Sequence, residues 1–250
     1  MNFKPILFTL LLISLFSCKS QYQVVEISGT IVEMDSIYDV QSQTKMSELV
    51  NSYKLELDIE MNEVIGRSAY FMDYKRPQSL LTNLTSDVMK AFGDEHLSNG
   101  ADVSLMNVHG HRSTMPKGEI TIGNLYEIYS FDNTITFIEL KGSDLKEIFN
   151  AYARLGGAGL SSNVKLIIED KKVKEVTIDD KTIDNGKTYN IVTLDYLADG
   201  NDSMTALLQA VSVNDTGITL RDMMIDWVKE QSRQGKMIES SLDGRIQIID

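Results

Sequence analysis

The sequence predicts an α+β fold in which helices pack on a mixed β-sheet. Segments with apolar residues three and four positions apart, typical of helices with one buried face, alternate with short apolar runs typical of strands. This alternation is irregular, which favours α+β over a regular doubly wound arrangement. The length of 250 residues, with 42% hydrophobic residues and 3 Pro, fits one globular domain with short extensions. No internal repeat or low-complexity segment appears.

The first half of the expected domain is read from helical periodicity and its stop signals. The helix over 46–61 is predicted by apolar residues on one side of the helix: Met46, Leu49, Val50, Tyr53, Leu57 and Met61. We expect Gly66 to end it. A second helix over 78–92 follows Pro77 and is expected to end at Gly93. A short buried strand is expected over 101–107, and one or two helical turns over 124–129.

The second half of the domain is predicted to contain most of the strands. Alternating apolar residues predict a strand over 134–140, and a helix over 144–155 is expected to be capped by Gly142 and Ser143. The turn at 184–187 separates the last two of three further strands. The remaining expected elements are the strands 164–168, 173–178 and 189–194 and a closing helix over 220–230.

The charge balance argues against a polymeric nucleic acid as partner. The chain carries 24 Lys and Arg against 36 Asp and Glu, a net charge of −12, whereas phosphate backbones require a basic face. A small anion is still compatible, because a local Arg can oppose the overall field. With 3 His and 1 Cys in the whole chain, a metal centre with several ligands would need mostly carboxylates.

The first residues have the pattern of a secretory leader with a lipid attachment site. Lys4 precedes an apolar run over 6–16 that is shorter than the roughly 20 residues of a permanent membrane helix. The run ends in Leu15-Phe16-Ser17-Cys18, which resembles a bacterial lipobox. We therefore expect a lipoprotein signal peptide over 1–17 and lipidation at Cys18, which would anchor the protein in the bacterial cell envelope, on its periplasmic or surface side. A secretory peptide with a chance Cys and an uncleaved anchor are the alternatives.

The segment 18–46 is polar and is expected to serve as a tether with a first β element over 24–32. The domain proper is expected over 47–250.

Polar residues directly after the strand 101–107 form a candidate binding segment, because sheets present ligand groups at such strand ends. Asn107 offers hydrogen bonds, Gly110 permits close backbone approach, and Arg112 offers a bidentate fork for an anion. A surface turn with an exposed Arg is the alternative interpretation.

Motifs in a fixed order over about 47–250 resemble the C-terminal domain of the 5'-nucleotidase family. That family reads Asn-x-Gly-Gly-x-Arg, Pro-x-Gly-x-Ile-Thr, Pro-Phe-x-Asn and Leu-x-Gly-x-x-Leu. The corresponding segments here are NVHGHR at 107–112, PKGEIT at 116–121, SFDN at 130–133 and LKGSDL at 140–145, followed by GGAGL at 156–160, KTY at 187–189 and TLDYLADGND at 193–202.

The resemblance implies a nucleotide-binding domain and assigns roles to its residues. Phe131 and Tyr196 would stack on the two faces of the base, and Arg112 would hold the phosphate or the ribose side. Asn107 and Gly110 would border that anion. Asn133 and Asp202 would hydrogen-bond the base or ribose, and Gly157 and Gly159 would belong to a loop near the base. Core packing is the alternative role for the two aromatic residues.

Departures from the family pattern affect the anion end of the site. His109 stands where the family has the first Gly of its Gly-Gly pair, and His111 stands where it has Ile before the Arg. The family has an Arg just ahead of the second helix, whereas here Pro77 precedes Gln78, and Arg76 is the candidate for a second anion contact.

The resemblance also implies that the two metal ions of the full enzyme belong to its other domain. The chain lacks the Gly-Asn-His-Glu motif, so we expect no metal and no catalytic residue here, and a divalent metal pair in a partner. The chain is expected to supply base and phosphate recognition to a separate metallophosphatase that hydrolyses nucleotide phosphomonoesters. The alternatives are a surface lipoprotein that binds nucleosides or nucleotides without catalysis and a degenerate interaction scaffold.

Overall fold

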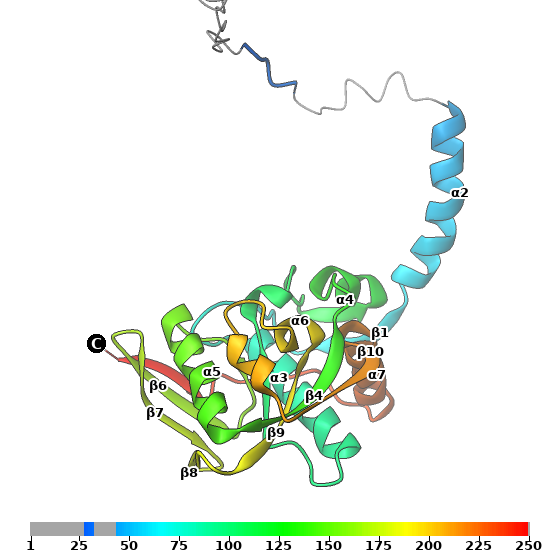
Figure 1. The fold of residues 1–250 in the computed structure, drawn as a ribbon. Coiled ribbons are helices and arrows are strands. Elements are labelled where there is room, and N and C mark those ends of the chain that lie inside the picture. Colours follow the sequence, from blue (N-terminus) through cyan, green and yellow to red (C-terminus); the bar gives the residue numbers. More distant parts are fainter. Residues whose placement is uncertain (1–27, 33–43, 250) are drawn as a thin grey trace, which may run out of the picture. The chain divides into compact units, whose positions relative to one another are not determined.

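The computed structural model describes residues 28–32 and 44–249 (Figure 1). The leader and Cys18 lie outside the described residues. The chain divides into two compact units, 1–50 and 51–250. In the first unit, residues 28–32 form no strand, so the described part of the β element expected over 24–32 is not one. Among the described residues, no helix combines the length and apolar character needed to cross a membrane.

The helix α2 (Thr44–Met61) forms as predicted, but its expected buried face is exposed. Tyr53 and Leu57 are 70% and 55% exposed, and only Met61 packs partly against the core. The expectation that Gly66 ends the helix is also wrong. The helix ends at Met61, and Gly66 lies in the strand β1 (Val64–Ser68), where a Cβ would come within 2.7 Å of Val228 Cγ1. Gly66 is therefore explained by close packing on a helix and not by helix termination.

A five-stranded sheet forms the centre of the second unit. Its strand order is β10-β4-β9-β2-β5. The strands β2 and β9 run parallel, and the remaining pairs are antiparallel, so the sheet is mixed as predicted. The bounds are β2 (Val103–Met106), β4 (Thr134–Lys141), β5 (Gly159–Leu160), β9 (Thr188–Leu194) and β10 (Ser212–Thr219).

Two smaller sheets complete the strand structure. The order β11-β6-β7-β8 describes a four-stranded sheet in which β11 runs parallel to β6. Its strands are β6 (Val164–Glu169), β7 (Lys172–Ile178), β8 (Lys181–Thr182) and β11 (Ile246–Ile249). The strand β1 pairs with β3 (Gly118–Thr121) in a two-stranded sheet.

The helices connect these sheets. The helix α3 packs against β2, β5 and β9, whereas α5 packs against both β4 and β7 and so joins the two larger sheets. The helices are α3 (Leu80–His96), α4 (Ile122–Ile128), α5 (Gly142–Leu155), α6 (Asp195–Ala198) and α7 (Leu220–Arg233), with short 3₁₀ turns η2 (Val108–Gly110) and η3 (Thr205–Gln209).

Two helix boundaries differ from the prediction for the same physical reason. Gly93 was expected to end α3, yet the helix continues to His96 and Gly93 packs directly against Val192. At the start of α5, Lys141 is the N-cap and makes no side-chain capping bond, and Gly142 already lies in the helix. A side chain at position 142 would collide with the carbonyl of Asp184. Both glycines allow the backbone to pack closely and neither ends nor caps a helix.

The sequence prediction omitted β1 and all four edge strands of the two larger sheets, namely β5, β8, β10 and β11. Most of β10 is exposed, so the apolar periodicity that marks the other strands is absent there. The α+β fold class itself is confirmed.

Candidate functional site

The pocket lies where three strands of the five-stranded sheet meet the same edge. Asn107 directly follows β2, and Tyr196 lies in α6, which begins immediately after β9. These strands are parallel, so their carboxyl ends share an edge. The strand β4 is antiparallel to β9, with Ile135 opposite Leu194, so Asn133 just before β4 reaches the same edge.

The cavity at this edge has a volume of about 320 Å³, within the usual range for small-molecule sites. Seven of the ten binding residues predicted from the sequence line it. These are Asn107, Gly110, Arg112, Phe131, Asn133, Tyr196 and Asp202. The structure therefore brings together predicted side chains from three separate motifs of the chain, at 107–112, 130–133 and 193–202. Their roles in binding stay predictions.

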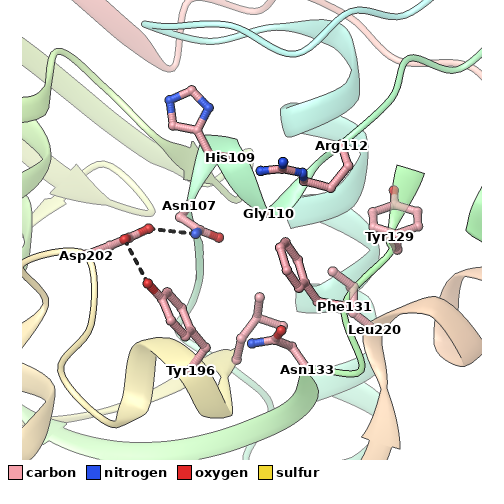
Figure 2. A pocket seen from close by; sticks show the side chains of 11 residues that line it. Asn107, His109, Gly110, Arg112, Tyr129, Phe131, Asn133, Tyr196, Asp202 and Leu220 are labelled. Atoms are coloured by element: carbon pink, nitrogen blue, oxygen red, sulfur yellow. Dashed lines mark hydrogen bonds between the residues drawn. The ribbon is translucent and has the colours of Figure 1, made fainter. Parts of the chain in front are cut away.

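Two aromatic rings face each other across the pocket. Phe131 is 50% exposed and Tyr196 is 40% exposed, although most aromatic rings of a domain are buried. Figure 2 shows these rings on opposite sides of the cavity, with Arg112 and Asn107 at one end and Asn133 at the other. Core packing as the role of these two residues does not agree with this exposure. A flat, apolar group inserted between the rings would cover both.

Asp202 joins two walls of the pocket. Its Oδ2 accepts a hydrogen bond from Asn107 Nδ2 at 2.7 Å, and its Oδ1 accepts one from the Tyr196 hydroxyl at 3.1 Å (Figure 2). Asp202 has a φ of +52°, which is uncommon for a residue with a side chain. The hydrogen bond to the Asp202 carboxylate raises the pKa of Tyr196, since ionisation would place two negative charges side by side.

The Asn107 side chain leaves one buried polar atom unpaired. Its Oδ1 has no hydrogen-bond partner among the described residues, and a Cβ on Gly110 would lie 2.7 Å from it. Gly110 therefore preserves the space beside this oxygen. An unpaired buried acceptor costs stability, so a ligand donor that reached it would bind favourably.

Arg112 provides the positive charge of the pocket. Its backbone N–H donates to the carbonyl of Ile128 at 2.9 Å, which fixes its place in the loop after η2. The exposed guanidinium lies 5.6 Å from the centroid of the Phe131 ring, a cation–π distance. A cation next to an aromatic wall suits a ligand that combines a flat ring with an anion.

The three other predicted residues do not line this cavity. Arg76 lines an adjoining cavity of about 380 Å³ that shares Asn107, His109 and Asp202 with the first. Its Nη1 donates to the carbonyl of Gly157 at 2.5 Å.

The two predicted glycines outside the cavity, Gly157 and Gly159, allow the backbone to pack closely. Gly157 has a φ of +107°, and a side chain there would strike the backbone of Pro77. Gly159 is buried in β5, paired with Met106, where a Cβ would lie 2.7 Å from Ser86 Oγ.

Sequence reasoning assigned no binding role to the apolar floor of the pocket. Tyr129, Leu194 and Leu220 line it and are buried, and His109 lines it at the polar end. Leu194 and Leu220 sit at the end of β9 and the start of α7, so their position at a strand or helix boundary was the available signal. Their burial gives no signal in sequence that separates them from core residues.

The histidines do not fit the two-metal site that the family resemblance implies for the full enzyme. His96 Nδ1 lies 2.8 Å from the carbonyl of Phe92 and its ring stacks on Phe92, whereas His111 is buried with both ring nitrogens in hydrogen bonds. Only His109 lines the pocket. Across residues 28–32 and 44–249, no three His, Cys, Asp or Glu side chains form a group suited to a metal ion.

The sequence profile of the family described as 5'-nucleotidase, C-terminal domain, matches residues 63–209. The chain belongs to this family. The resemblance seen in the motifs is thereby confirmed, and this 5'-nucleotidase C-terminal domain contains β2, β4, β9, α6 and thus the whole strand edge that forms the pocket.

Relatives agree with this assignment. Protein UshA of Yersinia enterocolitica is 24% identical over 218 residues, covering 84% of this chain and 39% of the relative. Endonuclease YhcR of Bacillus subtilis is 34% identical over 136 residues, covering 53% of this chain and 11% of the relative. The crystal structure of a 5'-nucleotidase precursor from Thermus thermophilus has a TM-score of 0.70 and 27% identity, covering 84% of this chain and 44% of that one. The chain spans about two fifths of the length of the Yersinia UshA protein and of the Thermus structure.

Proposed function

We propose that this chain is the nucleotide-binding half of a split 5'-nucleotidase, which acts with a separate metallophosphatase that hydrolyses nucleotide phosphomonoesters. The observation that carries this proposal is the convergence of Phe131, Tyr196 and Arg112 on one cavity. Two exposed aromatic rings can stack on a purine or a pyrimidine base, and the guanidinium can bind a phosphate. Membership of the 5'-nucleotidase C-terminal domain family supports the same substrate class.

In the proposed complex, the base lies between the rings of Phe131 and Tyr196. Asn133 hydrogen-bonds the base edge or the ribose. The Asp202 carboxylate accepts hydrogen bonds from ribose hydroxyls while it remains bonded to Asn107. Arg112 lies at the end of the pocket opposite Asn133 and holds the phosphate (Figure 2).

The partner supplies the hydrolytic chemistry in this proposal. Its divalent metal pair would activate water and stabilise the charge on the phosphoryl group. The residues of this chain bind and orient the nucleotide, because a correctly positioned substrate reacts faster than a free one. We also propose that lipidation at Cys18 holds the protein in the bacterial cell envelope, where the partner would meet it.

A capture experiment with a matched variant tests the split arrangement. The tagged full-length chain and its Arg112→Ala variant are each used to capture envelope proteins from the source cells. We expect both baits to recover a metal-dependent phosphatase. The wild-type complex would hydrolyse AMP at least about 10-fold faster than the variant complex, because one charged contact to the phosphate is lost.

Hydrolysis of p-nitrophenyl phosphate by the wild-type complex provides the control, since this substrate carries a phosphate but no ribose or base and should be used much more slowly than AMP. Two results would overturn the proposal. One is rapid AMP hydrolysis by the purified chain alone with Mn²⁺. The other is capture of no phosphatase together with retained AMP binding, which would leave a non-catalytic nucleotide-binding protein.

A further inference from the structure

The loop that carries Asn107, Gly110 and Arg112 also carries a fully buried histidine. His111 is 1% exposed, whereas its neighbour Arg112 is exposed and lines the pocket. His111 contributes no atom to the wall of that cavity. A buried imidazole next to the pocket's cation therefore requires a role other than ligand contact.

Both nitrogens of the His111 ring are hydrogen-bonded. Nδ1 lies 3.1 Å from the carbonyl oxygen of Val108, which can only accept, so Nδ1 carries the proton and donates. Nε2, which carries no proton, lies 2.9 Å from Thr85 Oγ1 and accepts from this hydroxyl, whose single proton also points to the Leu81 carbonyl at 2.9 Å. The Tyr129 hydroxyl, 2.7 Å from the same Oγ1, is then the donor in that pair. The ring is thus tied to its own loop and to the helix α3.

The ring of His111 also packs between two aromatic residues. It stacks on Tyr74 with a centroid separation of 5.8 Å and meets Tyr129 at 5.6 Å. These contacts hold the end of the short turn η2 against the segment before α3 and against the end of α4, while the bond to Thr85 holds it against α3 itself. The next residue, Arg112, donates its backbone N–H to Ile128, so His111 and Arg112 share the same neighbouring segment.

Phe131 depends less on His111 than Arg112 does. The segment that leads to Phe131 is held by a bond from the Tyr129 N–H to Leu125 and by a bond from Arg221 Nη1 to the Tyr129 carbonyl at 3.1 Å. Loss of the His111 ring leaves both of those bonds in place. It removes the side chain that fixes the residue before Arg112.

Burial keeps the His111 ring neutral. It lowers the pKa of His111 to about 4, although the hydrogen bond to the Val108 carbonyl acts in the opposite direction. A neutral ring has one donor and one acceptor, as the Val108 carbonyl and the Thr85 hydroxyl require.

We infer that His111 is a positioning residue, which holds Arg112 where it meets the anionic group of the ligand. The inference rests on the proposed function for the identity of that ligand. The inference predicts that a substitution of His111 changes nucleotide binding and nucleoside binding to different extents. Removing the ring weakens binding of a nucleotide more than binding of the corresponding nucleoside, because the aromatic walls stay in place.

Calorimetric titration of the full chain with AMP and with adenosine tests this selectivity. For His111→Leu we expect the affinity for AMP to fall about 10-fold, the scale of one charged contact, and that for adenosine to change less than about 3-fold. Thr85→Val removes the same bond from α3 and gives a second route if His111→Leu does not fold. His111→Gln keeps a donor and an acceptor and should restore most of the affinity for AMP.

Leu166→Ala is the matched control. Leu166 is buried in β6, outside the pocket, so this variant loses stability through a cavity while its ratio of AMP to adenosine affinity stays at the wild-type value. An unchanged ratio in both His111→Leu and Thr85→Val would overturn the inference and leave the proposed function intact.

Failure of the wild type to bind either ligand would overturn the proposed function instead. The inference is then decided by hydrogen exchange at the Arg112 amide in the ligand-free protein. Faster exchange in His111→Leu than in Leu166→Ala supports it, and equal exchange overturns it.

Discussion

Charged side chains form hydrogen-bonded groups at two places in the molecule. One is the pocket at the five-stranded sheet, and the other is the start of β11, an edge strand of the four-stranded sheet. At the pocket, Asp202 bonds Asn107 and Tyr196 where solvent reaches them. Beside β11, Arg245 is only 4% exposed, bonds Asp87 and Asp243, and donates to the carbonyl of Leu160 at 2.7 Å. The first group can exchange its partners for a ligand, whereas the second is fully used in joining α3, β5 and the start of β11.

This difference shows which polar groups serve stability and which are available for binding. A buried ion pair that loses one partner leaves an uncompensated charge, whereas an exposed group regains water. Burial alone would raise the pKa of Asp243, but Arg245 overrides this and lowers it. The Arg245 group is therefore a structural connection, whereas the Asp202 group has the exposure that a binding site requires.

The largest expected effect at neutral pH is the loss of the Arg245 connection. Arg245→Ala should reduce the free energy of unfolding by roughly 2–3 kcal/mol, because Asp87 and Asp243 lose their cation and the Leu160 carbonyl loses its donor. The loss is less than for a fully buried pair, since the two carboxylates are 37% and 33% exposed to water. Urea denaturation measures the loss. A change below about 1 kcal/mol would show that water satisfies the two carboxylates and that the contrast with the pocket is mistaken.

The second effect concerns the buried ring of His111 and depends on pH. The pKa of His111 is lowered from its ordinary 6.5 to about 4, so the unfolded chain binds the proton more readily than the folded chain. The free energy of unfolding is therefore highest, as far as His111 is concerned, above about pH 6.5. It falls by about 3 kcal/mol as the pH drops to about 4. The pH slope of urea stability should be smaller in His111→Leu. Equal slopes in the two proteins would contradict the prediction.

On the pocket side, Tyr196→Ala tests stacking. Affinity for adenosine should fall roughly 10-fold to 100-fold, the range measured for single base–aromatic contacts. Tyr196→Phe keeps the ring and loses only the bond to Asp202, so its affinity should stay within about 3-fold of wild type. Calorimetry distinguishes the two, and equal losses would assign the effect to the hydroxyl.

Arg112→Lys examines the anion end of the same pocket. A lysine keeps the charge but cannot form the planar, bidentate contact of a guanidinium, so affinity for AMP should fall about 5-fold while adenosine is unaffected. Titrations of wild type and variant with AMP and with adenosine, each at two salt concentrations, measure these affinities. An equal loss for both ligands would mean that Arg112 supports the Phe131 wall and does not contact phosphate.

The smallest effect is expected at an exposed pair in the four-stranded sheet itself. Lys174 bonds Glu169 at 2.7 Å, and their side chains are 49% and 41% exposed. Lys174→Ala should change the free energy of unfolding by less than about 0.5 kcal/mol. A loss approaching that of Arg245→Ala would mean that burial does not separate structural from dispensable charges in this sheet.

The sequence was sufficient for most of the sheet and for much of the pocket. The strands β2, β4 and β9 were predicted because they are buried on both faces or alternate clearly, and Asn107 and Tyr196 follow directly from their ends. Periodicity could not reveal β10, because an exposed edge strand is stabilised by backbone pairing with β4 and not by an apolar face. The edge position of a strand is a property of the sheet.

Glycines were the most misleading local signal. The sequence pattern predicts helix stops or caps at Gly66, Gly93 and Gly142, and each instead allows another segment to pack closely. A glycine that ends a helix and a glycine that admits a neighbouring side chain have the same local sequence pattern. The apolar face of α2 misled for a similar reason. Periodicity shows that a helix has an apolar face, but it does not show whether another segment covers that face.

By itself, the sequence determined the α+β class, the family resemblance and the set of candidate binding residues, since these depend on periodicity and on motif order. Only the tertiary structure decided which of those side chains share one cavity, that Arg76, Gly157 and Gly159 lie outside it, and that His111 is buried while His109 is not. The physical reason is that convergence and burial depend on strand pairing between distant segments, such as β2 with β9, whose partners the local sequence does not specify.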